Sequence, residues 1–162
     1  MEELILQEFE KQNSKAGHIL MLKNLNFGLL QKLNPKQRDQ FEPAVNSLIE
    51  KGFITYEDGK NGPECFRLTD LGFGNLYLDS RSTDDIEDLI LKKFEEQNSK
   101  AGHILMLANL NFGLLQKLNP KEKEKFEEAI NSLIEKGFIT HEDGKNGPEC
   151  FRLTDLGYEN LY

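Results

Sequence analysis

Apolar and polar positions in the first part of the chain follow a helical and then an extended spacing. In residues 2–12, Leu4, Ile5 and Phe9 form one apolar stripe among charged side chains, which predicts an amphipathic helix. Residues 18–22 form a continuous apolar run, whose short length favours a buried strand. Periodicity alone leaves a helix open for this run, because a fully apolar segment has no polar face.

Two further helices are expected next, separated by a tight turn. Leucines at helical spacing predict a short helix over residues 26–33. Asn34 is a favoured N-cap and Pro35 suits a first helical position, so a third helix is expected over about residues 35–51. Together these elements form a helix-turn-helix. Pro43 lies inside the third helix and predicts a kink there.

The spacing becomes extended after the third helix. Residues 53–56 and 64–68 read as strands, and the segment between them contains the turn dipeptides Asp58-Gly59 and Asn61-Gly62. This arrangement predicts a β-hairpin with a loop longer than two residues. A short final helix is expected within residues 69–77.

The whole pattern occurs twice in the sequence. Residues 2–77 return as residues 87–162 without gaps, and 14 of these 76 positions differ. The sequence therefore predicts two tandem domains made from one repeat. We expect these domains to cover residues 1–77 and 86–162, joined by a polar linker over residues 78–85.

The differences between the copies are concentrated in one element. Six of the fourteen lie in the third helix, at positions 37, 38, 39, 40, 43 and 45 of the first copy. Glu128 replaces Pro43, so the third helix of the second copy is expected to be straighter. Between Phe53 and Gly72 only Tyr56 changes, to His141. We therefore expect a shared scaffold that presents two different third-helix surfaces.

Charge and composition narrow the function classes. Residues 1–77 carry a net charge of −2 and residues 86–162 a net charge of −4, so only a local patch could serve a nucleic acid. No apolar run approaches the roughly 20 residues needed to span a membrane, and no membrane partner is expected. The two cysteines, Cys65 and Cys150, occupy the same position in the two copies. One thiol per copy fits the reducing cytoplasm, where we expect the protein to be located.

The sequence offers little for catalysis or metal binding. His18 and Cys65 occur once per repeat, and each repeat lacks two further ligands for a zinc site. Cys65 has no evident base nearby, and no nucleophile elbow or glycine-rich phosphate loop is present. We expect neither an enzyme nor a bound cofactor.

The order of the predicted elements and two segments resemble the winged helix family. Residues 48–54, LIEKGFI, are similar to the end of a recognition helix passing into the first wing strand. Residues 66–72, FRLTDLG, look like the second wing strand and the turn after it, as in many bacterial winged helix regulators. The resemblance covers nearly all of each repeat. It implies an α+β, mainly α fold of two tandem winged helix domains, each with three helices and a small antiparallel β-hairpin wing.

This resemblance implies a DNA-binding transcriptional regulator whose two copies act as a built-in dimer. In that family the third helix enters the major groove and the wing contacts the phosphate backbone. Arg and Gln can read base edges, and Lys can neutralise phosphates. The nucleic-acid-binding residues implied in this way are Lys36, Gln37, Arg38, Gln40, Asn46, Lys60, Lys121, Lys123, Lys125, Asn131 and Lys145.

The acidic character of the chain keeps a second hypothesis open. Acidic side chains interrupt the third helix in both copies, and the wing tip has more acid than base. Winged helix domains also serve as protein-interaction modules, so the partner is either double-stranded DNA or another protein. Near-identical repeats can also pack on each other or exchange elements in a domain-swapped dimer.

Overall fold

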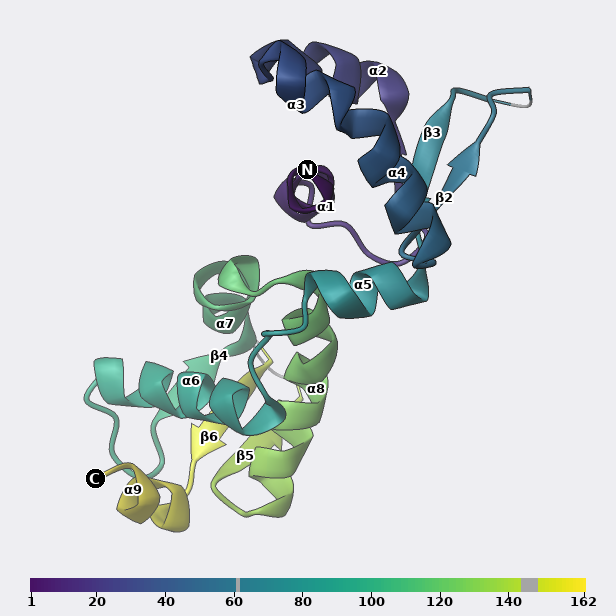
Figure 1. Cartoon of the computed structure of the whole chain (residues 1–162). Helices are drawn as coiled ribbons and strands as arrows, with labels where there is room; N and C mark the ends of the chain where they lie inside the picture. The colour runs from purple at the N-terminus through teal and green to yellow at the C-terminus, as the bar shows by residue number, and fades with distance from the viewer. Residues whose placement is uncertain (61, 144–148) are drawn as a thin grey trace. The chain divides into compact units, whose positions relative to one another are not determined.

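The computed structural model describes residues 1–60, 62–143 and 149–162 of the chain (Figure 1). The protein is α+β, which confirms the predicted class. It divides into two compact units, unit 1 over Met1–Leu78 and unit 2 over Asp79–Tyr162. Each unit contains helices and one three-stranded antiparallel sheet.

Unit 1 contains the predicted first helix, strands and final helix, but its second and third helices differ from the prediction. Its sheet has the order β1-β3-β2, so the apolar run near residue 20 is a strand that pairs with the second strand of the hairpin. Its elements in chain order are α1 (Glu2–Lys11), β1 (Ile19–Met21), α2 (Leu22–Phe27), a 3₁₀ turn (Leu30–Lys32), α3 (Pro35–Asp39), α4 (Phe41–Glu50), β2 (Ile54–Glu57), β3 (Cys65–Leu68) and α5 (Asp70–Leu76).

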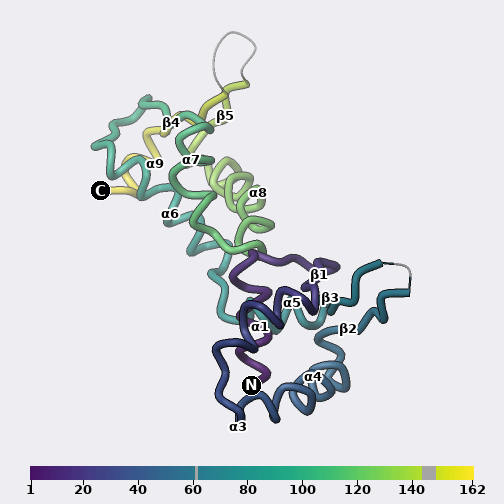
Figure 2. Tube along the Cα trace, turned by 90° about the horizontal axis from the view of Figure 1, so that it is seen from above, coloured from purple at the N-terminus to yellow at the C-terminus, as the bar shows by residue number. Residues whose placement is uncertain are grey.

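The sheet register determines which strand residues meet the helices. Leu20 and Tyr56 are both paired with Phe66, one from each side, so these three side chains share one face of the sheet. The hairpin β2–β3 runs beside α4, and its turn end projects beyond the helices of unit 1 (Figure 2). The predicted stripe of α1 is confirmed, because Ile5 and Phe9 are fully buried in the core of unit 1.

The third helix of unit 1 is broken into α3 and α4. Gln40 separates them, with φ −86° and ψ −6°. Pro43 has no N–H to donate to the carbonyl of Asp39, and its ring would clash with that carbonyl in a regular helix. The predicted kink is therefore present as a break one turn before the proline.

Unit 2 repeats the same architecture with a continuous third helix. Its sheet has the order β4-β6-β5. Its elements are α6 (Thr83–Glu96), β4 (Ile104–Met106), α7 (Leu107–Gly113), a 3₁₀ turn (Leu115–Lys117), α8 (Pro120–Glu135), β5 (Ile139–Glu142), β6 (Cys150–Leu153) and α9 (Asp155–Leu161). Helix α8 runs without interruption through Glu128, the counterpart of Pro43.

Two predicted boundaries differ from the structure. The helix expected over residues 26–33 is wrong: α2 starts at Leu22, directly after β1, and ends at Phe27. The Gly28 N–H bonds to the carbonyl oxygen of Asn24, and a Cβ at Gly28 would lie 2.8 Å from that oxygen, so glycine suits this helix end before the 3₁₀ turn. In unit 2, α6 begins at Thr83, inside the segment predicted as linker, because Ser82 is its N-cap.

Candidate functional site

The third-helix candidates of unit 1 lie in different local settings. Lys36 is exposed on α3. Gln37 completes a capping box with Asn34: its side chain accepts a hydrogen bond from the Asn34 N–H at 3.1 Å. Gln40 is the exposed residue at the break between α3 and α4. Asn46 is exposed on α4 and faces the hollow between this helix and the hairpin.

Two cations of unit 1 already have intramolecular partners. Arg38 Nε donates to the backbone oxygens of Leu30 at 3.0 Å and Leu33 at 3.1 Å, which holds the guanidinium against the preceding turn. Lys60 Nζ lies 2.8 Å from Asp58 Oδ2. This ion pair is exposed, so it is weak, but it reduces the positive charge that the hairpin presents.

The candidates of unit 2 are less exposed than those of unit 1. Lys121, Lys123 and Lys125 are all half-buried, and Lys125 Nζ donates to the carbonyl oxygen of Arg81 at 2.7 Å. Asn131 is exposed and faces the same kind of hollow as its counterpart in unit 1. Lys145 lies outside the described residues.

Acidic side chains dominate the exposed surface of the third helix in unit 2. Glu124, Glu127, Glu128 and Glu135 are all exposed on α8. The corresponding surface of unit 1 is also acidic, although less so, with Asp39, Glu42 and Glu50 exposed. Such a surface repels phosphates and attracts cations.

Each unit has an apolar groove between its third helix and its hairpin. The groove of unit 1, called groove one, encloses about 400 Å³. Val45 and Phe66 are buried and form its floor, whereas Glu42, Tyr56 and Glu64 are exposed and form its rim. The remaining lining residues are Leu22, Phe41, Asn46 and Ile49.

The groove of unit 2, called groove two, encloses about 410 Å³ and reuses the same positions. Its floor includes the buried Phe126 and Phe151, and its rim carries the exposed Glu127, His141 and Glu149. The remaining lining residues are Leu107, Asn111, Leu115, Ile130, Asn131 and Ile134. Because the two grooves have similar size and equivalent lining positions, we infer that the fold of the repeat produces the groove in each unit.

One rim position distinguishes the two grooves. In groove one the Tyr56 hydroxyl donates to Glu64, and this hydrogen bond raises the pKa of Tyr56. In groove two His141 Nε2 lies 2.8 Å from Glu149 Oε1. Both rings pack on the phenylalanine of the groove floor, with ring centroids 5.7 Å apart for Tyr56 and Phe66 and 5.4 Å apart for His141 and Phe151.

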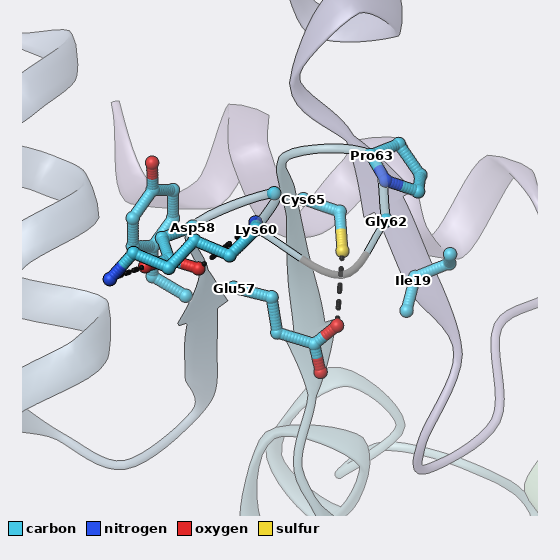
Figure 3. Close-up of a pocket in the computed structure, with 9 residues that line it drawn as sticks. Ile19, Glu57, Asp58, Lys60, Gly62, Pro63 and Cys65 are labelled. Carbon is cyan, nitrogen blue, oxygen red and sulfur yellow. Dashed lines mark hydrogen bonds and ion pairs between the residues drawn. The ribbon is translucent and has the colours of Figure 1, made fainter.

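A different hollow lies on the opposite face of the sheet in unit 1 and contains the thiol of Cys65. Figure 3 shows the Glu57 carboxylate directed at Cys65 Sγ, which donates to Glu57 Oε2 at 3.5 Å. Burial, and then this hydrogen bond, raise the pKa of Cys65. A buried thiol with a raised pKa is a poor nucleophile, so this hollow offers little chemistry.

The described part of the chain contains no group of three or more His, Cys, Asp or Glu side chains placed to hold a metal ion. Within the same residues, no helix is both long and apolar enough to cross a membrane.

Comparisons with models of known protein families and with curated proteins return no match. The resemblance to winged helix domains therefore stays a prediction that rests on the two segments and on the element order.

The residues predicted to bind a ligand are cations and amides of the third helix and hairpin, and they include few residues of the grooves. The rim residues Tyr56, Glu64 and their counterparts lie on the hairpin, outside the third helix from which most candidates were taken. One signal was present: the change from Tyr56 to His141 is the single difference in the hairpin region. That change marks the position where the two grooves differ most in chemistry.

Proposed function

We propose that the protein is an interaction module in which each unit binds a basic, apolar segment of a partner protein in its groove. The observation that carries this proposal is an apolar groove with an acidic rim at the same place in both units. Volumes near 400 Å³ fall within the range of about 300–1,000 Å³ that is usual for ligand pockets.

The apolar floor supplies the attractive part of this proposed interaction. Ile49 is 36 % exposed in groove one although it lies next to buried core residues. An apolar partner side chain covering it would remove this surface from water, and such burial contributes about 25 cal/mol per Å². Floors of this kind suit the Leu, Ile or Phe side chains of an amphipathic segment.

The rim supplies the charge selection. Groove one carries Glu42 and Glu64, and groove two carries Glu127 and Glu149. These carboxylates favour Lys or Arg beside the apolar side chains of the partner and disfavour an acidic segment. The same carboxylates would repel the phosphates of duplex DNA, whose binding depends on neutralisation by cations.

Charge reversal on the third helix tests this proposal with a matched control. The full chain is titrated with a fluorescent amphipathic peptide in which Lys flanks Leu and Phe, and binding is followed by fluorescence anisotropy. The double variant Glu42→Lys with Glu127→Lys reverses one charge on each rim and should weaken binding about tenfold, because each change removes a carboxylate and adds a cation. The control, Glu50→Lys with Glu135→Lys, makes the same charge change on exposed positions of α4 and α8 that do not line the grooves.

The control variant should bind the peptide nearly as well as the native chain. Equal loss in both variants would show a non-specific charge effect and overturn the proposal. A random DNA duplex serves as the second probe. Salt-dependent DNA binding that is lost with Lys36→Glu and Lys121→Glu would support the transcriptional-regulator prediction instead.

A further inference from the structure

We propose that the two grooves are unequal receptors: groove one has a constant rim charge, whereas groove two binds its basic segment in a pH-dependent way through protonation of His141. This inference rests on the proposed function, because it concerns what regulates the same grooves. It comes from the geometry of one position, Tyr56 in unit 1 and His141 in unit 2, together with its carboxylate partner.

In groove one the rim pair carries one negative charge throughout the neutral range. The Tyr56 hydroxyl is a neutral donor, and Glu64 is the carboxylate that accepts its hydrogen bond. Tyrosine ionises only in strongly alkaline solution. A phenol and a carboxylate have no ordinary titration between about pH 8 and about pH 5.5, so this type of pair gives no charge change in that range.

In groove two the corresponding pair contains an imidazole in place of the phenol. A neutral His141 donates through Nε2 to Glu149, 2.8 Å away, and the pair carries one negative charge. When the imidazole takes up a proton, the two charges cancel and the pair becomes neutral. Histidine is the side chain whose ordinary titration falls between about pH 5 and about pH 8.

The other elements around groove two contribute few further titratable groups. From α8 the described charged residue in the groove is Glu127, and from α7 the polar residue is the uncharged Asn111. Carboxylates ordinarily stay ionised well below neutral pH. Protonation of His141 therefore removes about half of the negative charge on the described rim, which consists of Glu127 and Glu149.

A second difference makes groove two the more acidic site at neutral pH. In unit 1 Lys23 lies beside Glu64, and both line a small depression next to groove one. The counterpart of Lys23 in unit 2 is Ala108. At about pH 8 the basic peptide should therefore bind groove two more tightly than groove one.

The test isolates each groove within the full chain. Glu42→Lys weakens groove one, so that titration with the Lys, Leu and Phe peptide at about pH 8 and about pH 5.5 reports mainly on groove two. We expect affinity to fall about two- to fivefold on acidification, the size of one exposed ion pair. The reciprocal chain, with Glu127→Lys, should show no such fall.

Exchange of the two native residues supplies the decisive control. Adding His141→Tyr to the Glu42→Lys chain should remove the pH dependence, and adding Tyr56→His to the Glu127→Lys chain should create it. Each residue is native at the equivalent position of the other unit, so both variants should fold. Circular dichroism checks this at both pH values.

The outcomes separate this inference from the proposed function. Peptide binding that weakens equally with Tyr and with His at position 141 would overturn the inference and leave the proposed function standing. No peptide binding at either pH, in a chain shown to be folded, would overturn both.

Discussion

The third helix is broken in unit 1 and continuous in unit 2, although its surroundings are nearly identical in sequence. In unit 1 Pro43 cannot donate to the carbonyl of Asp39, and Gln40 lies between two shorter helices. In unit 2 Glu128 stands at the proline position, and α8 spans Pro120–Glu135. The comparison teaches that this fold accommodates a helix break at the surface when the core positions stay in register.

Local contacts reinforce the continuous helix. Glu122 is 4 % exposed and accepts hydrogen bonds from the backbone N–H and the guanidinium of Arg81. Thr83 donates to Glu128 at 3.4 Å, and Lys125 donates to the carbonyl oxygen of Arg81. Helix α8 is therefore tied, within unit 2, to Arg81 and Thr83 at the beginning of α6.

The strongest way to break this comparison is to place a proline in unit 2. Glu128→Pro should split α8 as in unit 1 and destabilise unit 2 by about 3 kcal/mol, the usual cost of proline inside a helix. Hydrogen exchange by mass spectrometry should show lost protection in residues 120–135, with residues 35–50 unchanged. The control Glu128→Ala removes the contact with Thr83 and keeps the helix. Unchanged protection in the proline variant would contradict the explanation given for unit 1.

Removal of the buried carboxylate of α8 should have the next largest effect. Glu122→Ala leaves the Arg81 guanidinium and the Asn119 N–H without their acceptor. The loss should reduce the free energy of unfolding by about 1–3 kcal/mol. Urea unfolding followed by circular dichroism measures it.

The matched variant in unit 1, Gln37→Ala, removes a capping side chain without a buried charge. It should reduce the free energy of unfolding by about 0.5–1 kcal/mol. Equal losses in both units would show that Arg81 adds nothing to the capping contact of Glu122.

Joining the broken helix is expected to have a smaller, stabilising effect. Pro43→Glu restores the hydrogen bond to the carbonyl of Asp39 and should stabilise unit 1 by about 1 kcal/mol. The gain is smaller than the cost of the reverse change because the native break already relieves the clash. Greater helical ellipticity and slower exchange in residues 35–50 would confirm it. No change in either measurement would identify Gln40, and not Pro43, as the origin of the break.

The smallest effect concerns an ion pair that occurs at equivalent positions in each unit. Lys136 Nζ lies 2.5 Å from Glu87 in unit 2, and Lys51 Nζ lies 2.5 Å from Glu2 in unit 1, but the Glu87 side chain is 7 % exposed and that of Glu2 34 %. The hydrogen bond to Glu87 raises the pKa of Lys136 above its ordinary value of 10.5. The stabilisation by this pair is therefore complete at pH values below 10.5, the ordinary pKa of Lys136.

Its contribution should be lost as the pH rises through the raised pKa of Lys136. The urea concentration at the unfolding midpoint should fall as the pH rises through this alkaline range for the native chain. Lys136→Met should reduce this dependence of the midpoint on pH more than Lys51→Met does. The same pH dependence of the midpoint in both variants would show that burial of Glu87 does not strengthen its ion pair with Lys136.

Much of the fold follows from local sequence signals. The stripe of α1, the capping residues Asn34 and Asn119, and the break at Pro43 each depend on residues within a few positions of one another. The helix expected over residues 26–33 was wrong because leucine spacing shows which side chains are buried and not where the backbone turns. That turn lies at Gly28, close to the carbonyl of Asn24.

The candidate site was much less predictable. Cations were selected from their type and position on the third helix, yet Arg38, Lys60 and Lys125 have partners within their own units. Whether a cation is free for a ligand depends on which carbonyls and carboxylates the fold brings within reach. Side-chain type alone does not contain that information.

The sequence by itself determined the duplication, the α+β class, the order of the elements and the residues at which the two copies diverge. Periodicity, caps and turn dipeptides act over a few residues, so a single chain displays them directly. Only the tertiary structure decided that Tyr56 and His141 meet carboxylates over an apolar floor. The rim pairs lie within each hairpin, but the groove beneath them exists only when the third helix packs beside the sheet and brings residues such as Val45 next to Phe66.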